Sequence, residues 1–181
     1  MARFESESNK RDAQRQLLQH ALPEYGRGTL KAYEFMEKYH SVDILMVDDD
    51  ELDVELFRRS LTKNRIANRL VWAQDGVEAL EILQGKRAES IEQPAIVLLD
   101  INMPRMNGLE FLDAIRADPA LKTLTVFVLT TSQDDRDIAR AYENNVAGYM
   151  VKSELGESFA EGIGLLDHYW RVVELPSDSA T

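Results

Sequence analysis

The sequence predicts an α/β domain built on a parallel sheet, and two features of the chain indicate it. Short apolar runs recur five times, and a stretch with helical spacing of its apolar residues follows each run. This alternation is typical of strands joined by crossover helices, the arrangement that produces a parallel sheet. The chain has 181 residues, of which 44% are hydrophobic, so it can form one domain with a buried core.

Each predicted strand is short and almost wholly apolar, as expected where both faces of a sheet are covered. The strands are predicted at residues 42–47, 69–73, 95–100, 124–130 and 147–151. The helices are predicted at residues 51–64, 75–85, 107–118, 134–145 and 154–173. Local signals support these boundaries, because Asp50 and Asp75 are suitable N-caps, Gly85 suits a helix end, and Pro119 stops the third helix.

Composition narrows the expected partners. The formal net charge is −11, which is a poor match for the phosphate backbone of nucleic acid. Cysteine is absent, which excludes disulfides and thiolate metal sites. The apolar runs are too short to cross a bilayer, and the first residues show no signal-peptide pattern. We therefore expect a cytoplasmic protein that binds neither nucleic acid nor membrane.

Charged and hydroxyl side chains follow four of the predicted strands. Asp48 and Asp49 follow the first strand, Asp100 the third, Thr130 ends the fourth, and Lys152 follows the fifth. In a parallel sheet these carboxyl ends share one edge, where ligands bind. Crowded carboxylates repel one another unless a cation such as Mg²⁺ relieves them. An aspartate can also accept a phosphoryl group, which a lysine can pair with, so the sequence predicts magnesium-assisted phosphoryl chemistry at this edge.

These motifs resemble the receiver domain of the response regulators of two-component signalling, over about residues 42–172. The motifs are "VDDD", "LLDINMPRMNG", "VLTTS" and "GYMVK". Their spacing also agrees, with 30 residues from Asp100 to Thr130 and 22 from Thr130 to Lys152. The resemblance implies a flavodoxin-like (βα)5 three-layer sandwich whose parallel strands lie in the order 2-1-3-4-5.

The resemblance assigns an expected role to each acidic residue. Asp100 corresponds to the phosphoacceptor. Asp48 and Asp49 correspond to the acidic pair that holds Mg²⁺ or Mn²⁺ together with Asp100, Asp49 as a direct ligand and Asp48 through water. The backbone carbonyl of Asn102 is expected to complete the protein's share of the metal ligands.

The remaining site residues follow the same family pattern, with one departure. Thr130 corresponds to the switch hydroxyl, Tyr149 to the aromatic residue whose rotamer follows it, and Lys152 to the phosphate-binding lysine. The family usually has a proline after this lysine, often with a cis peptide bond, whereas this chain has Ser153. Because a cis bond without proline costs about 3–4 kcal/mol, we expect the Lys152–Ser153 bond to be trans.

Simpler interpretations exist for each residue alone. Aspartates after a strand are often helix caps, Thr130 suits the end of a strand, and Tyr149 suits packing on an edge strand. An aspartyl-phosphate hydrolase also places a nucleophilic aspartate after an apolar strand, but it needs a second aspartate where this chain has Asn102. We therefore expect a phosphoacceptor protein with slow self-dephosphorylation rather than an enzyme. The competing hypothesis is a constitutive interaction module whose acidic site is vestigial.

The parts outside the domain lead to an expectation about output. Residues 1–41 are polar and are expected to be a partly helical or disordered extension, residues 42–174 the receiver, and residues 175–181 a tail. No output domain is expected, so the receiver must signal through its own surface as a stand-alone regulator.

The last helix has one apolar stripe for the core, formed by Phe159, Ile163, Leu166, Trp170 and Val173. A second stripe, continued past the helix, is formed by Leu165, Tyr169, Val172 and Leu175.

This second stripe needs a cover. A homodimer through the face of the fourth helix, fifth strand and fifth helix is one cover, and residues 29–40 folding back is the other. "QGKRAESIEQP" and "DHYWRVVELP" resemble segments of the single-domain receivers that partner bacterial and cyanobacterial phytochrome kinases. The expected partners are thus a sensor histidine kinase, a phytochrome being the candidate, and a histidine phosphotransfer protein if the phosphoryl group is relayed.

Overall fold

The computed structural model describes residues 42–91, 93–155, 159–173 and 175–176. The expected extension at residues 1–41 lies outside these residues, as does most of the expected tail at 175–181. None of the helices in the described part of the chain is long and apolar enough to span a bilayer.

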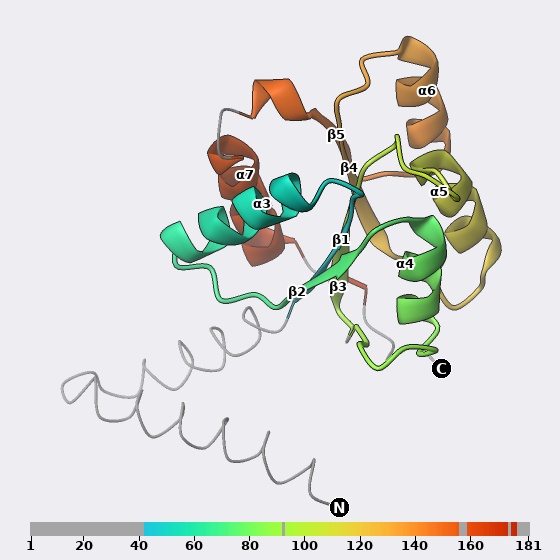
Figure 1. Cartoon of the computed structure of the whole chain (residues 1–181), viewed down its shortest axis with the longest axis horizontal. Coiled ribbons are helices and arrows are strands. Elements are labelled where there is room, and N and C mark those ends of the chain that lie inside the picture. Colours follow the sequence, from blue (N-terminus) through green and yellow to red (C-terminus); the bar gives the residue numbers. More distant parts are fainter. Residues whose placement is uncertain (1–41, 92, 156–158, 174, 177–181) are drawn as a thin grey trace, which may run out of the picture. The chain divides into compact units, whose positions relative to one another are not determined.

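Five strands form one parallel sheet in the order β2-β1-β3-β4-β5 (Figure 1). Their bounds are β1 Asp43–Val47, β2 Leu70–Ala73, β3 Ala95–Leu99, β4 Thr125–Thr130 and β5 Gly148–Val151. The central pairing places Val47 of β1 opposite both Ala73 of β2 and Leu99 of β3. The predicted flavodoxin-like topology is therefore confirmed, and the carboxyl ends of β1 and β3 lie side by side.

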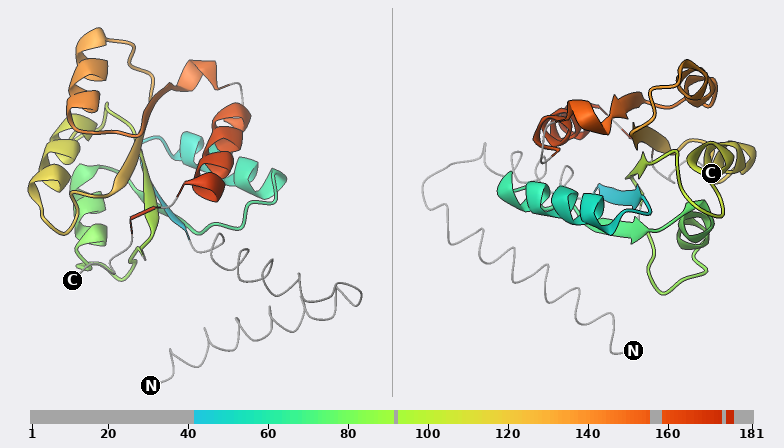
Figure 2. Two further views of the ribbon diagram at one scale, coloured as in Figure 1. Left: turned by 180° about the vertical axis from the view of Figure 1, so that it is seen from behind. Right: turned by 45° about the horizontal axis from the view of Figure 1, so that its top comes forward.

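Helices cover both faces of the sheet, as Figure 1 and the tilted view of Figure 2 show. α3 and α7 lie on one face, and α4, α5 and α6 lie on the other. Their bounds are α3 Glu51–Lys63, α4 Gly76–Leu83, α5 Gly108–Ala117, α6 Asp135–Glu143 and α7 Ala160–Val172. A short 3₁₀ helix, η1, spans Lys152–Glu154 between β5 and α7.

The predicted helix boundaries hold at α3, α4 and α5. The Asp50 carboxylate accepts a hydrogen bond from the Leu52 amide, and Asp75 caps α4 in the same way. Gly85 follows α4 with a φ of +66°, a conformation that glycine adopts without strain. The last helix begins at Ala160 rather than near residue 154, because the chain first makes the 3₁₀ turn of η1 and then reaches Phe159, whose φ is +54°.

The continuous apolar strands are explained by two cores, one under each helical layer. Alternate residues of a strand point to opposite faces. Leu45 and Val47 of β1 join the core under α4, α5 and α6, whereas Ile44 and Met46 join the core under α3 and α7. All five residues of β1 and of β3 are buried, so the site lies at the ends of the two fully buried strands of the sheet.

The first predicted stripe of α7 is largely buried, whereas the second is partly packed on the core and partly exposed to solvent. Phe159, Ile163, Leu166 and Trp170 are buried in the core shared with α3, as predicted, whereas Val173, the fifth predicted member, is the C-cap of α7 and only half-buried. Tyr169 also packs there, with its ring edge-on to Phe127 at a centroid distance of 4.9 Å, and Leu175 packs against the same core. Leu165 and Val172 are 56% and 65% exposed. The exposed part of the second stripe is therefore smaller than its sequence pattern indicated.

Candidate functional site

The sheet brings three predicted acidic residues together. Asp48 and Asp100 directly follow the paired residues Val47 and Leu99, and the Asp100 amide donates a hydrogen bond to the Val47 carbonyl (2.9 Å). Carboxylate oxygens of Asp48, Asp49 and Asp100 all lie within 4.8 Å of one another. Asp48 and Asp100 are buried, whereas Asp49 is exposed. This set of oxygen donors fits a hard divalent cation such as Mg²⁺ or Mn²⁺, reached from the exposed side.

Asp48 is held in place on both its side chain and its backbone. Its carboxylate accepts a hydrogen bond from the Asp50 amide (3.0 Å), and its carbonyl accepts one from the indole N–H of Trp72 (2.8 Å). Burial raises the pKa of the Asp48 carboxyl to about 6, against the lowering effect of the ion pair with Lys152. Keeping this carboxylate charged is therefore costly, which favours binding of a cation.

The carboxylate of Asp100 is oriented by its own loop. Oδ1 accepts hydrogen bonds from the Ile101 and Asn102 amides (2.6 and 3.3 Å), so Oδ2 is the oxygen that faces Lys152. The loop then turns tightly at Gly108, where a Cβ atom would lie 2.2 Å from the Asp100 carbonyl oxygen. A side chain at this position would displace the backbone that carries Asp100.

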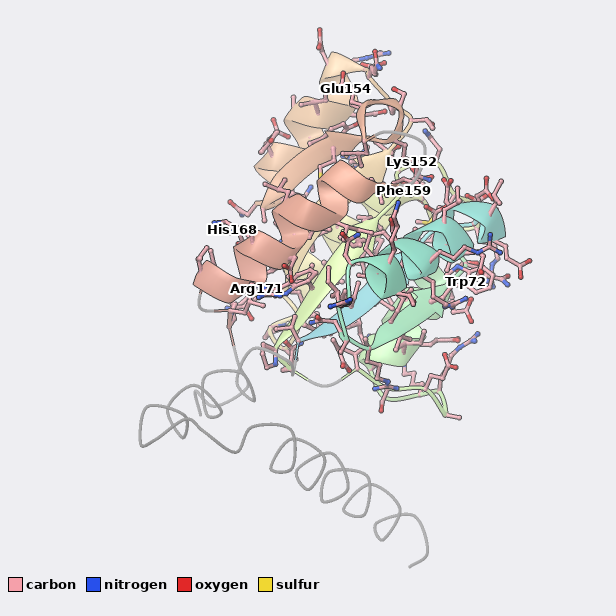
Figure 3. The ribbon with its side chains drawn as sticks, turned by 90° about the vertical axis from the view of Figure 1, so that its left-hand side faces the viewer. Trp72, Lys152, Glu154, Phe159, His168 and Arg171 are labelled. Atoms are coloured by element: carbon pink, nitrogen blue, oxygen red, sulfur yellow. The ribbon has the colours of Figure 1, made fainter. Side chains whose placement is uncertain are left out.

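Lys152 reaches from the end of β5 toward α3 and the acidic group (Figure 3). Its Nζ lies 2.7 Å from Asp48 Oδ2 and 3.2 Å from Asp100 Oδ2. Burial alone would lower the pKa of Lys152, but the hydrogen bonds to Asp48 and Asp53 outweigh it, so the pKa is raised and the ammonium stays charged.

Among the described residues, the one cis peptide bond is Gln93–Pro94, so the Lys152–Ser153 bond is trans, as expected.

Asp53 is a member of this cluster that the sequence interpretation missed. It lies in the first turn of α3, and its Oδ2 is 2.7 Å from Lys152 Nζ. In the sequence it looks like one of the acidic residues that commonly stabilise the start of a helix. The available signal was its position in the first turn of the helix that directly follows Asp48 and Asp49.

The two predicted switch residues meet at Ser132. Thr130 is fully buried, and its Oγ1 accepts a hydrogen bond from the Ser132 amide (3.2 Å). The Tyr149 hydroxyl donates to the Ser132 carbonyl (3.1 Å), and burial raises the pKa of this phenol. The Ser132 hydroxyl in turn donates to Asp137 of α6 (2.7 Å). One loop residue therefore connects Thr130, Tyr149 and α6, a link that the sequence did not reveal.

A five-stranded 2-1-3-4-5 sheet with acidic residues at the ends of β1 and β3 and a lysine at the end of β5 defines the class of response-regulator receivers. The chain matches the response regulator receiver domain over residues 44–161 and belongs to this family. It is therefore a protein of two-component signalling.

Among its relatives is response regulator Rcp1 of Synechocystis, 33% identical over 136 residues, which are 74% of this chain and 92% of Rcp1. The crystal structure of the Mn²⁺-bound form of Rcp1 matches with a TM-score of 0.65 and 31% identity, covering 76% of this chain and 99% of the other. The phosphorylated cyanobacterial phytochrome response regulator RcpA matches with a TM-score of 0.63, 31% identity and the same coverage. The chain is thus similar to response regulators of phytochromes.

Proposed function

We propose that the chain accepts a phosphoryl group on Asp100 from a sensor histidine kinase and signals through its own surface. The observation that carries this proposal is the placement of Asp100, whose carboxylate lies beside two further carboxylates and whose Oδ2 is 3.2 Å from the ammonium of Lys152. The similarity to RcpA, a cyanobacterial phytochrome response regulator, and to a bacteriophytochrome response regulator makes a phytochrome the candidate kinase here.

Asp100 is prepared to act as the nucleophile. Two amides hold Oδ1, so Oδ2 forms the bond to phosphorus while the bond from phosphorus to the phosphodonor's nitrogen breaks. Asp48, Asp49, Asp100 and the carbonyl of Asn102 would hold Mg²⁺ or Mn²⁺, which when bound neutralises the negative charge of the carboxylates and the phosphoryl oxygens. Lys152 contributes a further positive charge, 3.2 Å from Asp100 Oδ2.

Phosphorylation would then act on the hydroxyl side of the site. It replaces a carboxylate by a group with a charge of about −1.5 to −2 and three strong acceptor oxygens. Thr130 would have to turn its hydroxyl from the Ser132 amide toward the phosphoryl group, which frees the loop that also holds Tyr149. The change would reach the face formed by α6, β5 and α7, which is the family's fourth-helix, fifth-strand, fifth-helix face.

The output is a contact made by this face. Leu165 and Val172 are exposed apolar residues seven positions apart on α7, hence on the same side of the helix. We assign them to a homodimer that phosphorylation strengthens, within a cytoplasmic stand-alone receiver spanning residues 42–174. A histidine phosphotransfer protein is the expected partner if the phosphoryl group moves on.

The decisive experiment compares the protein with its Asp100→Asn variant in beryllofluoride and Mg²⁺, a mimic of the phosphorylated state. We expect two-dimensional NMR shifts around Thr130 and Tyr149 and a change in size-exclusion volume for the wild type, and neither change for the variant. Leu165→Glu should keep the NMR shifts and lose the size change. Equal behaviour of wild type and Asp100→Asn would instead support a constitutive interaction module.

The competing activity, hydrolysis by an aspartyl-phosphate mechanism, predicts steady turnover. Asn102 occupies the position where that mechanism needs an acid/base. Its backbone N–H donates a hydrogen bond to Asp100. We therefore expect at most stoichiometric labelling by acetyl phosphate, followed by slow loss. Continuous release of phosphate from small phosphate esters, abolished by Asp100→Asn, would contradict the proposal.

A further inference from the structure

Lys152 has a partner that the proposed reaction does not use. The ammonium group has three N–H donors, and it makes hydrogen bonds with Asp48, Asp53 and Asp100. The distance to Asp53 equals the distance to Asp48 and is shorter than that to Asp100. The lysine side chain is 8% exposed and that of Asp53 is 21% exposed, so this contact is largely shielded from water.

The three contacts differ in what the reaction would do to them. Asp100 becomes an acyl phosphate, so its carboxylate no longer exists as a partner for Lys152. Asp48 belongs to the group of carboxylates that fits a cation, and it would be shared with that ion. Asp53 lies outside that group. It is the one partner of the three that can keep its contact with Lys152 before and after phosphoryl transfer.

Lys152 benefits from such a partner because the other two restraints on its ammonium, Asp48 and Asp100, are the ones that the reaction would alter. A lysine side chain loses up to about 2 kcal/mol of rotamer entropy when it is ordered. Lys152 and the following residue, Ser153, lie in the short 3₁₀ turn of η1, which has no side-chain cap. Asp53 supplies a restraint from a different direction, because it is anchored in α3.

We propose that Asp53 is a positioning residue that holds the Lys152 ammonium facing Asp100, so that an incoming phosphoryl group meets a charge that is already oriented. This inference rests on the proposed phosphorylation of Asp100. It assigns to α3 a part in the chemistry, since the first turn of α3 then fixes a group that comes from the end of β5. Asp53 itself touches neither the phosphoryl group nor the cation.

The test compares Asp53→Asn with Glu51→Gln. Glu51 lies in the same first turn of α3 and is exposed, so its replacement removes the same charge without touching Lys152. Beryllofluoride binding in Mg²⁺, followed by ¹⁹F NMR, should weaken about 3- to 10-fold in Asp53→Asn and less than twofold in Glu51→Gln. Equal losses in both variants would show a general charge effect. Tighter binding in Asp53→Asn would show that Asp53 competes for the lysine. Either result overturns the inference.

A double-mutant cycle shows whether Asp53 acts through the lysine. In a Lys152→Met background, Asp53→Asn should change beryllofluoride binding by less than twofold, because the group that Asp53 positions is gone. An undiminished effect in that background overturns the inference. Thermal unfolding of each variant checks that it is folded.

A second measurement does not depend on phosphorylation. The ammonium protons of Lys152 should give an NMR signal in the metal-free wild type, because three hydrogen bonds slow their exchange with water. Asp53→Asn should weaken or remove that signal, and Glu51→Gln should not. An unchanged signal in Asp53→Asn overturns the inference. Wild-type protein that shows the signal but binds no beryllofluoride at Asp100 would refute the proposed function alone.

Discussion

The acidic half and the hydroxyl half of the site are held in different ways. On the acidic half, Asp48 and Asp100 are buried beside Lys152 and are oriented by backbone amides at the ends of two central strands. On the hydroxyl half, Thr130 and Tyr149 bond to Ser132, a residue of the loop after β4.

The difference indicates a division of labour. On the acidic half, the carboxylates that would hold a cation and the ammonium of Lys152 already face one another. The hydroxyl half is held by neutral hydrogen bonds to one loop, each of which contributes only about 1 kcal/mol. Under the proposed function, a new charge at Asp100 would therefore be enough to break them, so that the first half would bind and the second half would respond.

The largest expected effect comes from the backbone of the acidic half. Gly108→Ala would place a Cβ 2.2 Å from the Asp100 carbonyl oxygen and 2.9 Å from Ile101 Cα, both parts of the backbone. We expect a loss of about 2–4 kcal/mol in the free energy of unfolding, measured in urea. The matched control is Gly164→Ala in α7, where a Cβ meets nothing within 4 Å and helix propensity should add up to about 1 kcal/mol. Similar stabilities for both variants would contradict the close packing.

The affinity for Mg²⁺ separates the two halves most directly. Asp48→Asn removes a buried carboxylate from the donor set and should weaken Mg²⁺ binding about 10- to 100-fold, measured by calorimetry. Thr130→Val removes only the hydroxyl that meets the Ser132 amide, and it should change Mg²⁺ affinity by less than twofold. Comparable losses in the two variants would show that the halves are not separate.

The pH dependence of stability gives a smaller effect in the metal-free protein. The pKa of Asp48 is about 6 in the folded protein and near 4 in an unfolded chain. The stabilising effect of protonating Asp48 is therefore complete below pH 4 and is lost as the pH rises through 6. The unfolding free energy of Asp48→Asn, relative to wild type, should increase by about 1–2 kcal/mol from pH 4 to pH 7. Urea unfolding in EDTA measures it, and a difference that is constant with pH would contradict the burial of this charge.

The smallest expected effect belongs to the hydroxyl half. Tyr149→Phe removes the hydrogen bond to the Ser132 carbonyl and should cost about 0.5–1 kcal/mol of stability, with Mg²⁺ affinity unchanged. Tyr142→Phe is the control, because Tyr142 is exposed on α6. A larger loss of stability, or weaker Mg²⁺ binding, would show that Tyr149 supports the acidic half.

Most of the acidic half was predictable because its residues directly follow the predicted strands in the sequence. Once the apolar runs are recognised, a parallel sheet must bring Asp48, Asp100 and Lys152 to one edge. Asp53 was not predictable in the same way, since an acidic residue in a first helical turn is common and its contact depends on how far α3 lies from β5.

The divided stripe of α7 shows a second limit. Helical spacing places Leu165, Tyr169 and Val172 near one another, but it does not show where the covering core ends. Phe127 of β4 is large enough to reach Tyr169, and the chain after the helix brings Leu175 back to the same core. Tertiary contacts of this kind are set by side-chain size and loop path, which periodicity does not encode.

The position of Trp72 beside Asp48 should make its fluorescence sensitive to the acidic site. The chain has two tryptophans, and their surroundings differ: Trp170 is enclosed in the core beneath α7, while the indole of Trp72 is bonded to the Asp48 carbonyl. A cation that draws on the Asp48 carboxylate alters the electric field at the Trp72 ring, whereas Trp170 supplies a steady background. The intrinsic fluorescence should therefore register occupancy of the acidic site in unlabelled protein, in real time and at submicromolar concentration.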